Sequence, residues 1–595
     1  MKKRMTVAVA LLLVLVLLCG CGIPEGSLGS KLGDKLAELV QSTNGHNPDG
    51  LKFSDMHYTR PDLDKLSADV AAVEEALENG MKLKDVEELL DVCMDGYDEF
   101  STMYSLANIY NCKDLRDEYF AAEYEWISTE SAEVSRKYDR LYYACAGSPY
   151  GARLEEDYFW DGFCEEYDDP ADSYYTDETV ALMQRESELV SRYRGIVAQP
   201  TVLYDGEERD FNELFEQLSE ATDMASYYRY LAVLKSYYEK YSAPLGEVYI
   251  ELMRVRSDMA EAMGFDSCEA MEYGFCFERD YTPQDGARFV EQVKEHLVPI
   301  YVWARESGAL DGSDYSALSP EELRAGLAAT AASIGRDCAE TFFFMDRYRL
   351  YDIEPSLYKA DTSFEVYLNS YHSPFIFLNP VGTTEDLITF MHELGHATDA
   401  YVNDDAYETL DLAEVFSQAM EFLSLSHMDG VLSAREIDTL REGAVIGALN
   451  SFIQQSLLAD FEHKAYSLGA DALSPDKLNE LFLQSAKDFG FCEEGFEEYY
   501  MYYWMDIPHF FEFPFYVISY PVSLEVAMEI YELELSRPGL GESKYFEILP
   551  RDYDGFLETL DHGGLRDPFA EDSMVSVAAM IADALGYEGP LAEAA

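Results

Sequence analysis

Basic residues are scarce in this chain of 595 residues. Lysine and arginine together number 43, against 114 aspartates and glutamates, so the formal net charge is −71. A surface this acidic repels phosphate, and the composition therefore argues against a nucleic-acid partner. The acidity itself fits solvated helix faces that keep an extracytoplasmic protein soluble, or a preference for basic or neutral substrates.

Beyond Cys19 and Cys21, closely spaced cysteine pairs are absent as well. Two of the ten cysteines lie near the N-terminus, and the other eight are scattered without any C-x-x-C pair. We therefore expect mostly buried thiols and no cysteine metal site, although an extracytoplasmic compartment would permit disulfides. Hydrophobic residues make up 48% of the chain, which is enough for a large core and argues against a disordered protein.

The one long hydrophobic run stands at the N-terminus. Basic residues precede the apolar segment Val7–Leu18, which is too short for a membrane-spanning helix and is typical of a bacterial export signal. Small residues before Cys21 resemble a lipoprotein cleavage site; an ordinary secretory signal is the alternative. Residues 1–20 are thus a predicted signal peptide, Cys21 a predicted lipid anchor on the bacterial membrane, and residues 21–50 a predicted flexible tether.

Helical periodicity fills most of the remaining chain. Apolar residues recur at intervals of three and four, which predicts a helical N-terminal subdomain over residues 51–199. A short strand or turn near residue 200 marks a boundary, and residues 200–595 form the second predicted domain. A chain of this length exceeds one ordinary core, so it favours two or three subdomains or one large helical body.

One hairpin interrupts the helices. Ser363–Leu368 alternates apolar and polar residues, and Pro374–Asn379 forms a second run after a turn. The proline that opens the second run suits the start of a strand or an edge strand. An edge strand could pair with an extended peptide, which makes Phe375, Phe377 and Asn379 candidates for substrate binding; a purely structural hairpin is the alternative.

The pattern H-E-x-x-H follows this hairpin. His392 and His396 are four residues apart on a predicted helix that Thr383 caps and that runs to about Val402. Both imidazoles can therefore reach one zinc ion, and Glu393 lies beside them as the candidate general base that activates water. Two unrelated histidines on one helix remain the alternative.

A second helix offers a third ligand. Glu414, Gln418 and Glu421 share one face of a predicted helix that begins shortly after the H-E-x-x-H helix ends. We predict that Glu414 completes the metal site and that Glu421 orients a ligating histidine, although both could be solvated acids.

Hydrogen-bond donors for a developing oxyanion come from a distant aromatic segment. Tyr516 and Tyr520 are four residues apart on a helix predicted to start near Pro514, and His509 precedes them. Taken alone, this segment would indicate an aromatic core. Pro521 lacks the N–H that a helix interior would use, so its position beside Tyr520 bears on how that side chain is oriented.

Together these motifs resemble peptidase family M3, the thimet oligopeptidase-like zinc peptidases, and within it the oligoendopeptidase F group. The resemblance rests on the run from Pro374 into H-E-x-x-H, the helix of Glu414, the segment from Ile507 to Tyr520, and Gly563-Gly564 near the C-terminus. It covers about residues 201–585.

The resemblance implies a role for each matching residue. One Zn²⁺ ion would be held by His392, His396 and Glu414. Glu393 would act first as general base and then as the acid that protonates the leaving amine. The implied residues that bind the substrate backbone and stabilise the oxyanion are His509, Tyr516 and, as a third, Tyr520.

The resemblance also implies a fold and a function. The expected fold is a mainly α, large helical body with a deep substrate channel and a small β-sheet beside the H-E-x-x-H helix. The expected activity is that of a zinc-dependent metallo-oligopeptidase, a monomer that hydrolyses internal bonds of short peptides with a metal-activated water. A non-catalytic peptide-binding lipoprotein and a carboxypeptidase- or dipeptidase-type zinc enzyme are the alternatives.

Overall fold

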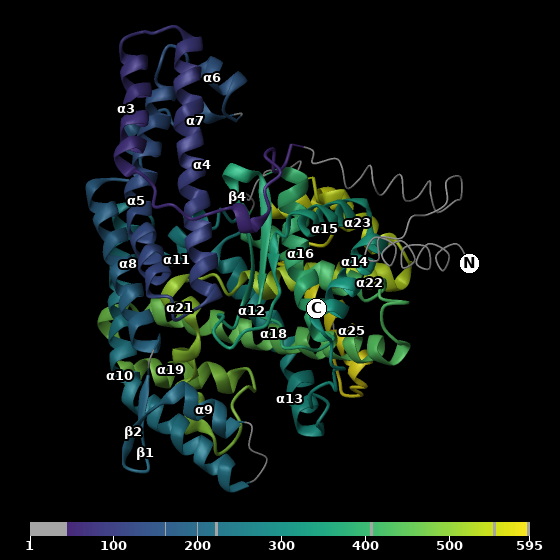
Figure 1. The fold of residues 1–595 in the computed structure, drawn as a ribbon. Helices are drawn as coiled ribbons and strands as arrows, with labels where there is room; N and C mark the ends of the chain where they lie inside the picture. Colours follow the sequence, from purple (N-terminus) through teal and green to yellow (C-terminus); the bar gives the residue numbers. More distant parts are fainter. Residues whose placement is uncertain are drawn as a thin grey trace, which may run out of the picture. The chain divides into compact units, whose positions relative to one another are not determined.

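The computed structural model describes residues 45–160, 162–198, 200–219, 224–404, 409–550 and 555–591. The predicted signal peptide, the predicted lipid anchor at Cys21 and most of the predicted tether lie outside these residues. Helices dominate the described chain and strands are few (Figure 1), which confirms the mainly α prediction. None of the eight cysteines in the described ranges forms a disulfide, and half of them are buried.

Two compact units divide the chain. The first comprises Met1–Gln184, Tyr315–Tyr407 and Ser424–Glu436, and the second comprises Arg185–Asp314, Glu408–Leu423 and Ile437–Ala595. Each unit is thus assembled from separate stretches of sequence. The predicted domain boundary at residues 199 and 200 stays a prediction.

The first unit is built mainly of helices. They are α3 (Leu63–Glu78), α4 (Leu83–Lys113), α5 (Glu118–Ala146), α6 (Gly151–Asp157), α7 (Phe163–Glu166), α14 (Pro320–Ile334), α15 (Arg336–Tyr348) and α16 (Glu385–Asn403), with α8 (Asp177–Ala198) beginning in this unit.

Local capping explains where several of these helices begin. Asp62 accepts the N–H of Lys65 at the start of α3, and Ser319 forms a capping box at the start of α14. Helices α3, α4 and α5 pack against one another along apolar stripes such as Leu66, Val70 and Val73 (Figure 1).

A three-stranded sheet in the first unit contains the predicted hairpin. Strands β4 (Ser363–Leu368) and β5 (Ser373–Leu378) pair antiparallel as expected. The unpredicted strand β3 (Tyr351–Asp352) pairs parallel with β5, so β5 is the central strand. Because β3 faces only Ile376 and Phe377, the proline at position 374 need not donate to it.

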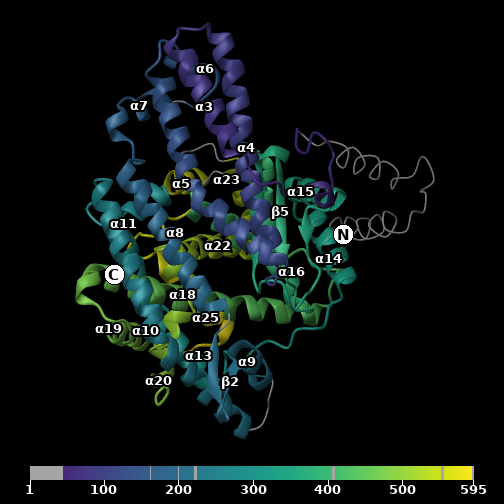
Figure 2. The same ribbon diagram turned by 60° about the vertical axis from the view of Figure 1, so that its left-hand side comes forward.

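Helix α16 packs on this sheet beside α15 (Figure 2). Its bounds agree with the predicted helix, but its N-cap residue is Thr384, which makes no side-chain cap hydrogen bond. The carboxylate of Asp386 accepts the backbone N–H groups of Val381, Gly382 and Thr383 at 2.8–3.0 Å. The predicted cap, Thr383, has a buried hydroxyl without a hydrogen-bond partner in the described part of the chain. Asp386 in the first turn of α16 therefore ties the loop that precedes the helix to its N-terminus.

The second unit is almost wholly helical. Its helices are α9 (Phe211–Ser219), α10 (Met224–Ala262), α11 (Cys268–Met271), α12 (Pro283–His296), α13 (Val298–Ser307), α17 (Leu410–Ser424), α18 (Ala434–Leu468), α19 (Pro475–Asp488), α20 (Glu497–Tyr500), α21 (Pro508–Glu512), α22 (Ser519–Ser536), α23 (Leu540–Ile548), α24 (Phe556–Gly563) and α25 (Ser573–Leu585). A short hairpin, β1 (Thr201–Tyr204) with β2 (Glu207–Asp210), turns at Asp205 and Gly206, which both have positive φ.

Candidate metal centre and active site

Helix α16 presents both histidines of the motif. The ring centroids of His392 and His396 are 5.1 Å apart, with planes inclined at 79°. Ligand atoms from His392, His396 and Glu414 all lie within 4.8 Å of one another. No other group of His, Cys, Asp and Glu in the described ranges meets the same criterion for holding a metal. Burial and the neighbouring His392 lower the pKa of His396 well below its ordinary value, so its ring is neutral and keeps a lone pair for a metal.

Glu414 comes from α17 and is only 3% exposed. The hydroxyl of Tyr516 donates to its Oε1 at 3.2 Å, and the hydroxyl of Ser417 donates to its Oε2 at 3.1 Å. These two hydrogen bonds hold the carboxylate in one orientation, as a metal ligand requires. Glu421 is half-buried two turns further along α17, and its predicted role in orienting a histidine stays a prediction.

Glu393 is 3% exposed on α16, and a second carboxyl group lies near it. Burial, with the charges of Glu393 and Asp399, raises the pKa of Glu365 on β4 well above its ordinary value. Glu365 thus remains neutral beside the predicted general base, which avoids placing two like charges together. The sequence pattern does not identify Glu365, because an acid in an alternating strand indicates only a solvated face.

His509, Tyr516 and Tyr520 form one aromatic cluster in the second unit. Their ring centroids are separated by 5.3–5.9 Å, and the hydroxyl of Tyr520 lies 3.4 Å from Nε2 of His509. Burial lowers the pKa of His509, and burial together with Glu414 and Tyr520 raises that of Tyr516 well above its usual range. The cluster therefore consists of neutral groups that can exchange hydrogen bonds with a substrate.

The helix predicted to start near Pro514 begins later, at Ser519. Pro521 consequently lies in the first turn of α22, where backbone N–H groups have no partner within the helix and a missing N–H costs nothing. The proline thus does not disturb the position of Tyr520. Tyr516 instead follows Phe515, whose φ of +59° turns the chain sharply.

Two buried side chains hold this turn. Glu462 accepts the N–H of Phe515 at 2.8 Å, and Arg279 donates to the carbonyl of Phe515 at 3.0 Å. Arg279 also bonds Ser519 and Asp411, so it ties the turn to the helix that carries Glu414. No local pattern indicates this support, because isolated charged residues far from a motif look like solvent-exposed residues.

The prediction that β5 is an edge strand, open to a peptide substrate, is wrong. Phe375 and Phe377 lie in the central strand with side chains that are 0% exposed, and the side chain of Asn379 bonds the backbone of Ser356. Both edges of β5 are already paired, so it has no free groups for a peptide beside β3 or β4. The edge positions belong to β3 and β4, and of these only β4 is long.

The ligand set fits zinc. Two imidazoles and a hydrogen-bonded carboxylate are the three protein ligands that catalytic zinc sites use, with one position left open. An adjacent buried glutamate completes the arrangement of a zinc-dependent metallopeptidase.

Comparison with known proteins supports the assignment to the metallopeptidases. The family model "Peptidase M3 N-terminal domain" matches residues 53–161, and "Peptidase family M3" matches residues 347–553. The plasmid-encoded oligoendopeptidase F of Lactococcus lactis subsp. cremoris is 22% identical over 547 residues, 82% of this chain and 87% of the relative. The oligoendopeptidase F homolog of Lactococcus lactis subsp. lactis (strain IL1403) is 22% identical over 549 residues, with the same coverage.

Solved structures share the fold. PZ peptidase A with an inhibitor superposes with a TM-score of 0.77 at 22% identity, covering 90% of this chain and 99% of that one. Oligoendopeptidase-F from Enterococcus faecium superposes with a TM-score of 0.59 at 15% identity, covering 88% and 97%. The chain belongs to peptidase family M3 and is a metallopeptidase similar to oligoendopeptidase F, with His392, His396 and Glu414 as its zinc site.

Proposed function

We propose that this metallopeptidase cleaves internal bonds of short peptides on the outer side of a bacterial membrane. The observation that carries the proposal is the convergence of His392, His396 and Glu414 within 4.8 Å, with Tyr516 bonded to the last of them. The similarity to oligoendopeptidases supports peptides as the substrate class. A deep channel that admits short peptides and a monomeric state belong to this proposal.

Zinc, when bound, supplies a Lewis acid for the scissile carbonyl and for water. Glu393 takes the proton from water and returns it to the leaving amine. Tyr516, with its high pKa, keeps its proton and donates a hydrogen bond to the carbonyl oxygen as negative charge develops there. His509 and Tyr520 lie next to Tyr516 and bind the substrate backbone.

The free edge of β4 replaces β5 as the proposed place for the extended peptide. Among the described strands, β4 pairs with β5 alone, and its other edge has backbone groups that a substrate strand can bind. Glu365 lies on this strand, close to the predicted general base.

A quenched fluorogenic peptide tests the activity. We expect cleavage that a chelator abolishes and added zinc restores. Product analysis on one nonapeptide distinguishes the alternatives, because an endopeptidase releases two internal fragments whereas a carboxypeptidase or dipeptidase releases terminal residues or dipeptides. The absence of any cleavage by zinc-loaded protein would leave only a peptide-binding role and would refute the proposal.

We propose further that Cys21 is acylated after removal of residues 1–20. The support is the N-terminal sequence alone, with its basic residues, short apolar run and cysteine. Within the described ranges, no helix is long and apolar enough to cross a membrane. Radiolabelled palmitate should label the wild-type chain and not the Cys21→Ser variant, and an unlabelled wild type would refute the anchor.

We also propose the division into a helical subdomain over residues 51–199 and a catalytic domain over residues 200–595. The two family matches support it, because residues 53–161 and 347–553 fall on either side of the boundary. A fragment of residues 51–199 that remained unfolded in circular dichroism would refute its independence.

A further inference from the structure

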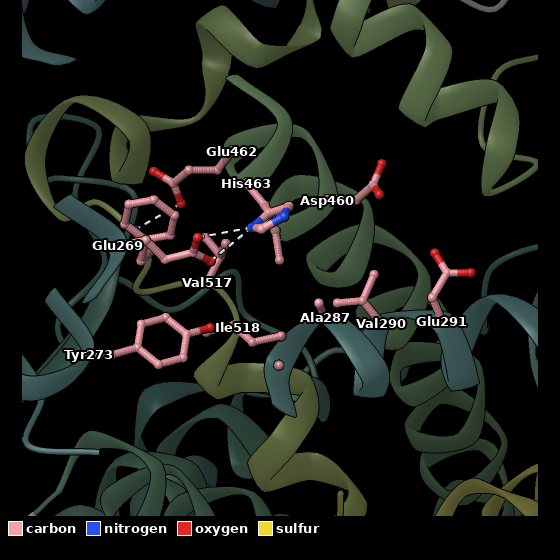
Figure 3. A pocket seen from close by; sticks show the side chains of 13 residues that line it. Glu269, Tyr273, Ala287, Val290, Glu291, Asp460, Glu462, His463, Val517 and Ile518 are labelled. Atoms are coloured by element: carbon pink, nitrogen blue, oxygen red, sulfur yellow. Dashed lines mark hydrogen bonds and ion pairs between the residues drawn. The ribbon is translucent and has the colours of Figure 1, made fainter. Parts of the chain in front are cut away.

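A cavity lies in the second unit, and none of the zinc ligands lines it. Its volume is about 200 Å³, room for about six water molecules or one small organic molecule. Side chains from α11, α12, α18 and the segment before α22 line it (Figure 3). The π-helical turn η3 (Glu272–Cys276) contributes Tyr273, and such turns recur at functional sites.

One carboxyl group in the wall has a hydrogen-bond partner for only one of its two oxygen atoms among the described residues. Glu462 is 1% exposed, and its Oε2 accepts the N–H of Phe515. Its Oε1 is buried and makes no hydrogen bond in the described part of the chain. Tyr273, which carries a phenolic hydroxyl, lines the same wall. A buried polar atom without a partner costs free energy that a ligand can restore.

The other lining acids are already paired. Glu269 forms an ion pair with His463 at 2.9 Å (Figure 3), Asp460 with Lys464 at 2.5 Å, and Glu291 with Lys294 at 2.6 Å. Glu462 is therefore the lining carboxyl group that forms no ion pair among the described residues. This carboxyl group is the part of the wall that can accept hydrogen bonds from a bound cation.

The shape and chemistry of the wall narrow the kind of cation. A metal ion would need several ligand atoms close together, and among the described residues only the zinc set provides them. The remaining wall is apolar, with Val290, Val517 and Ile518 facing the cavity (Figure 3). An apolar body with one positively charged donor group is the complement of such a wall.

We propose that this cavity binds a small primary ammonium compound with a short branched apolar chain, and that binding supports the active-site turn at Phe515. The ammonium donates to Oε1 of Glu462 and to the hydroxyl of Tyr273, and the alkyl chain covers the valine and isoleucine side chains. Burial raises the pKa of Glu462 well above its usual range, so an adjacent ammonium favours the ionised form.

The link to the active site runs through one residue. An ionised Glu462 is a stronger acceptor for the N–H of Phe515, whose positive φ sets the position of Tyr516. The hydroxyl of Tyr516 contacts Glu414 in turn. This part of the inference rests on the proposed peptidase activity, and it predicts that the amine raises kcat/KM.

Calorimetric titration of the purified protein with 3-methylbutylammonium tests the binding without reference to activity. We expect saturable binding with one site, and binding of the neutral isostere 3-methylbutanol that is about 10- to 100-fold weaker, as for the loss of one charged hydrogen bond. Equal affinity for the alcohol, or no binding of the amine, would overturn the proposal.

Variants locate the site. Glu462→Gln should weaken amine binding about 10- to 100-fold, and Val290→Phe, which fills the cavity from α12, should abolish it in protein that still unfolds cooperatively. Glu525→Gln is the matched control, because Glu525 is an equally buried glutamate outside the cavity. Undiminished binding by Val290→Phe, or equal losses in Glu462→Gln and Glu525→Gln, would contradict the site.

Peptide cleavage tests the coupling separately. Saturating amine should raise kcat/KM in the wild type and leave the Val290→Phe variant unchanged. Binding that leaves kcat/KM unaltered would refute the coupling, whereas an inactive protein that still binds the amine would refute the proposed function instead.

Discussion

Removal of a single oxygen atom from Tyr516 should slow peptide cleavage without releasing zinc. The hydroxyl is buried, lies 3.2 Å from Oε1 of Glu414 and keeps its proton because of its raised pKa. If it donates to the oxyanion, Tyr516→Phe loses one transition-state donor, which costs about 3 kcal/mol or roughly 10²-fold in kcat. KM should change little, because the interaction is strongest in the transition state.

A competing explanation is that the hydroxyl only orients Glu414. In that case the variant should lose about 10- to 100-fold in zinc affinity, and added zinc should restore kcat. We would therefore measure kcat and KM with a quenched fluorogenic peptide at saturating zinc, and zinc affinity by competition with a chromogenic chelator. Tyr249→Phe is the matched control, because its buried hydroxyl has no hydrogen-bond partner among the described residues. A kcat that zinc restores, or one equal to the control, would refute the oxyanion role.

Further outcomes follow from the same geometry. Glu393→Gln should retain stoichiometric zinc yet lose about 10²- to 10⁴-fold in kcat, measured at saturating peptide; normal turnover would disprove its role as general base. His392→Ala should bind no zinc by metal analysis after dialysis, because two ligands remain; full occupancy would show that the ligand set is wrong. Burial raises the pKa of Glu525 from its usual 4.5 to about 8, so the folded form keeps a proton that the unfolded chain releases. Its contribution to stability is complete below pH 4.5 and is lost as the pH rises to 8. Denaturant titrations should therefore show that wild type loses about 3 kcal/mol more than Glu525→Gln between pH 5 and pH 8, and parallel losses would contradict the shift.

Local sequence patterns predicted the elements of the site well. The spacing of His392 and His396 requires a helix to bring both rings to one metal, and α16 has nearly the predicted bounds. The alternation in residues 363–368 likewise predicted β4. Both rules depend on residues close in sequence, where backbone geometry alone fixes which side chains share a face.

Pairing between segments that are distant in sequence could not be predicted from local patterns. Strand β3 has two residues, too few for any periodicity, yet it makes β5 central and removes Phe375 and Phe377 from contact with a substrate. The start of α22 is another example. The four-residue spacing of Tyr516 and Tyr520 suggested one helix, whereas Phe515 turns the chain and the helix begins at Ser519.

The sequence alone determined the chemistry of this protein: two imidazoles and a glutamate on helical spacing, an acid to move protons, and tyrosines to donate hydrogen bonds. These functional groups can be recognised from residue types and from spacings of a few residues. The tertiary structure alone decided how they are held. Arg279 and Glu462 fix the two sides of the Phe515 peptide from 236 and 53 residues away. Glu365 stays neutral near Glu393 because burial and nearby acids disfavour its charge. Such effects depend on distance in space and on exclusion of water, which no local pattern records.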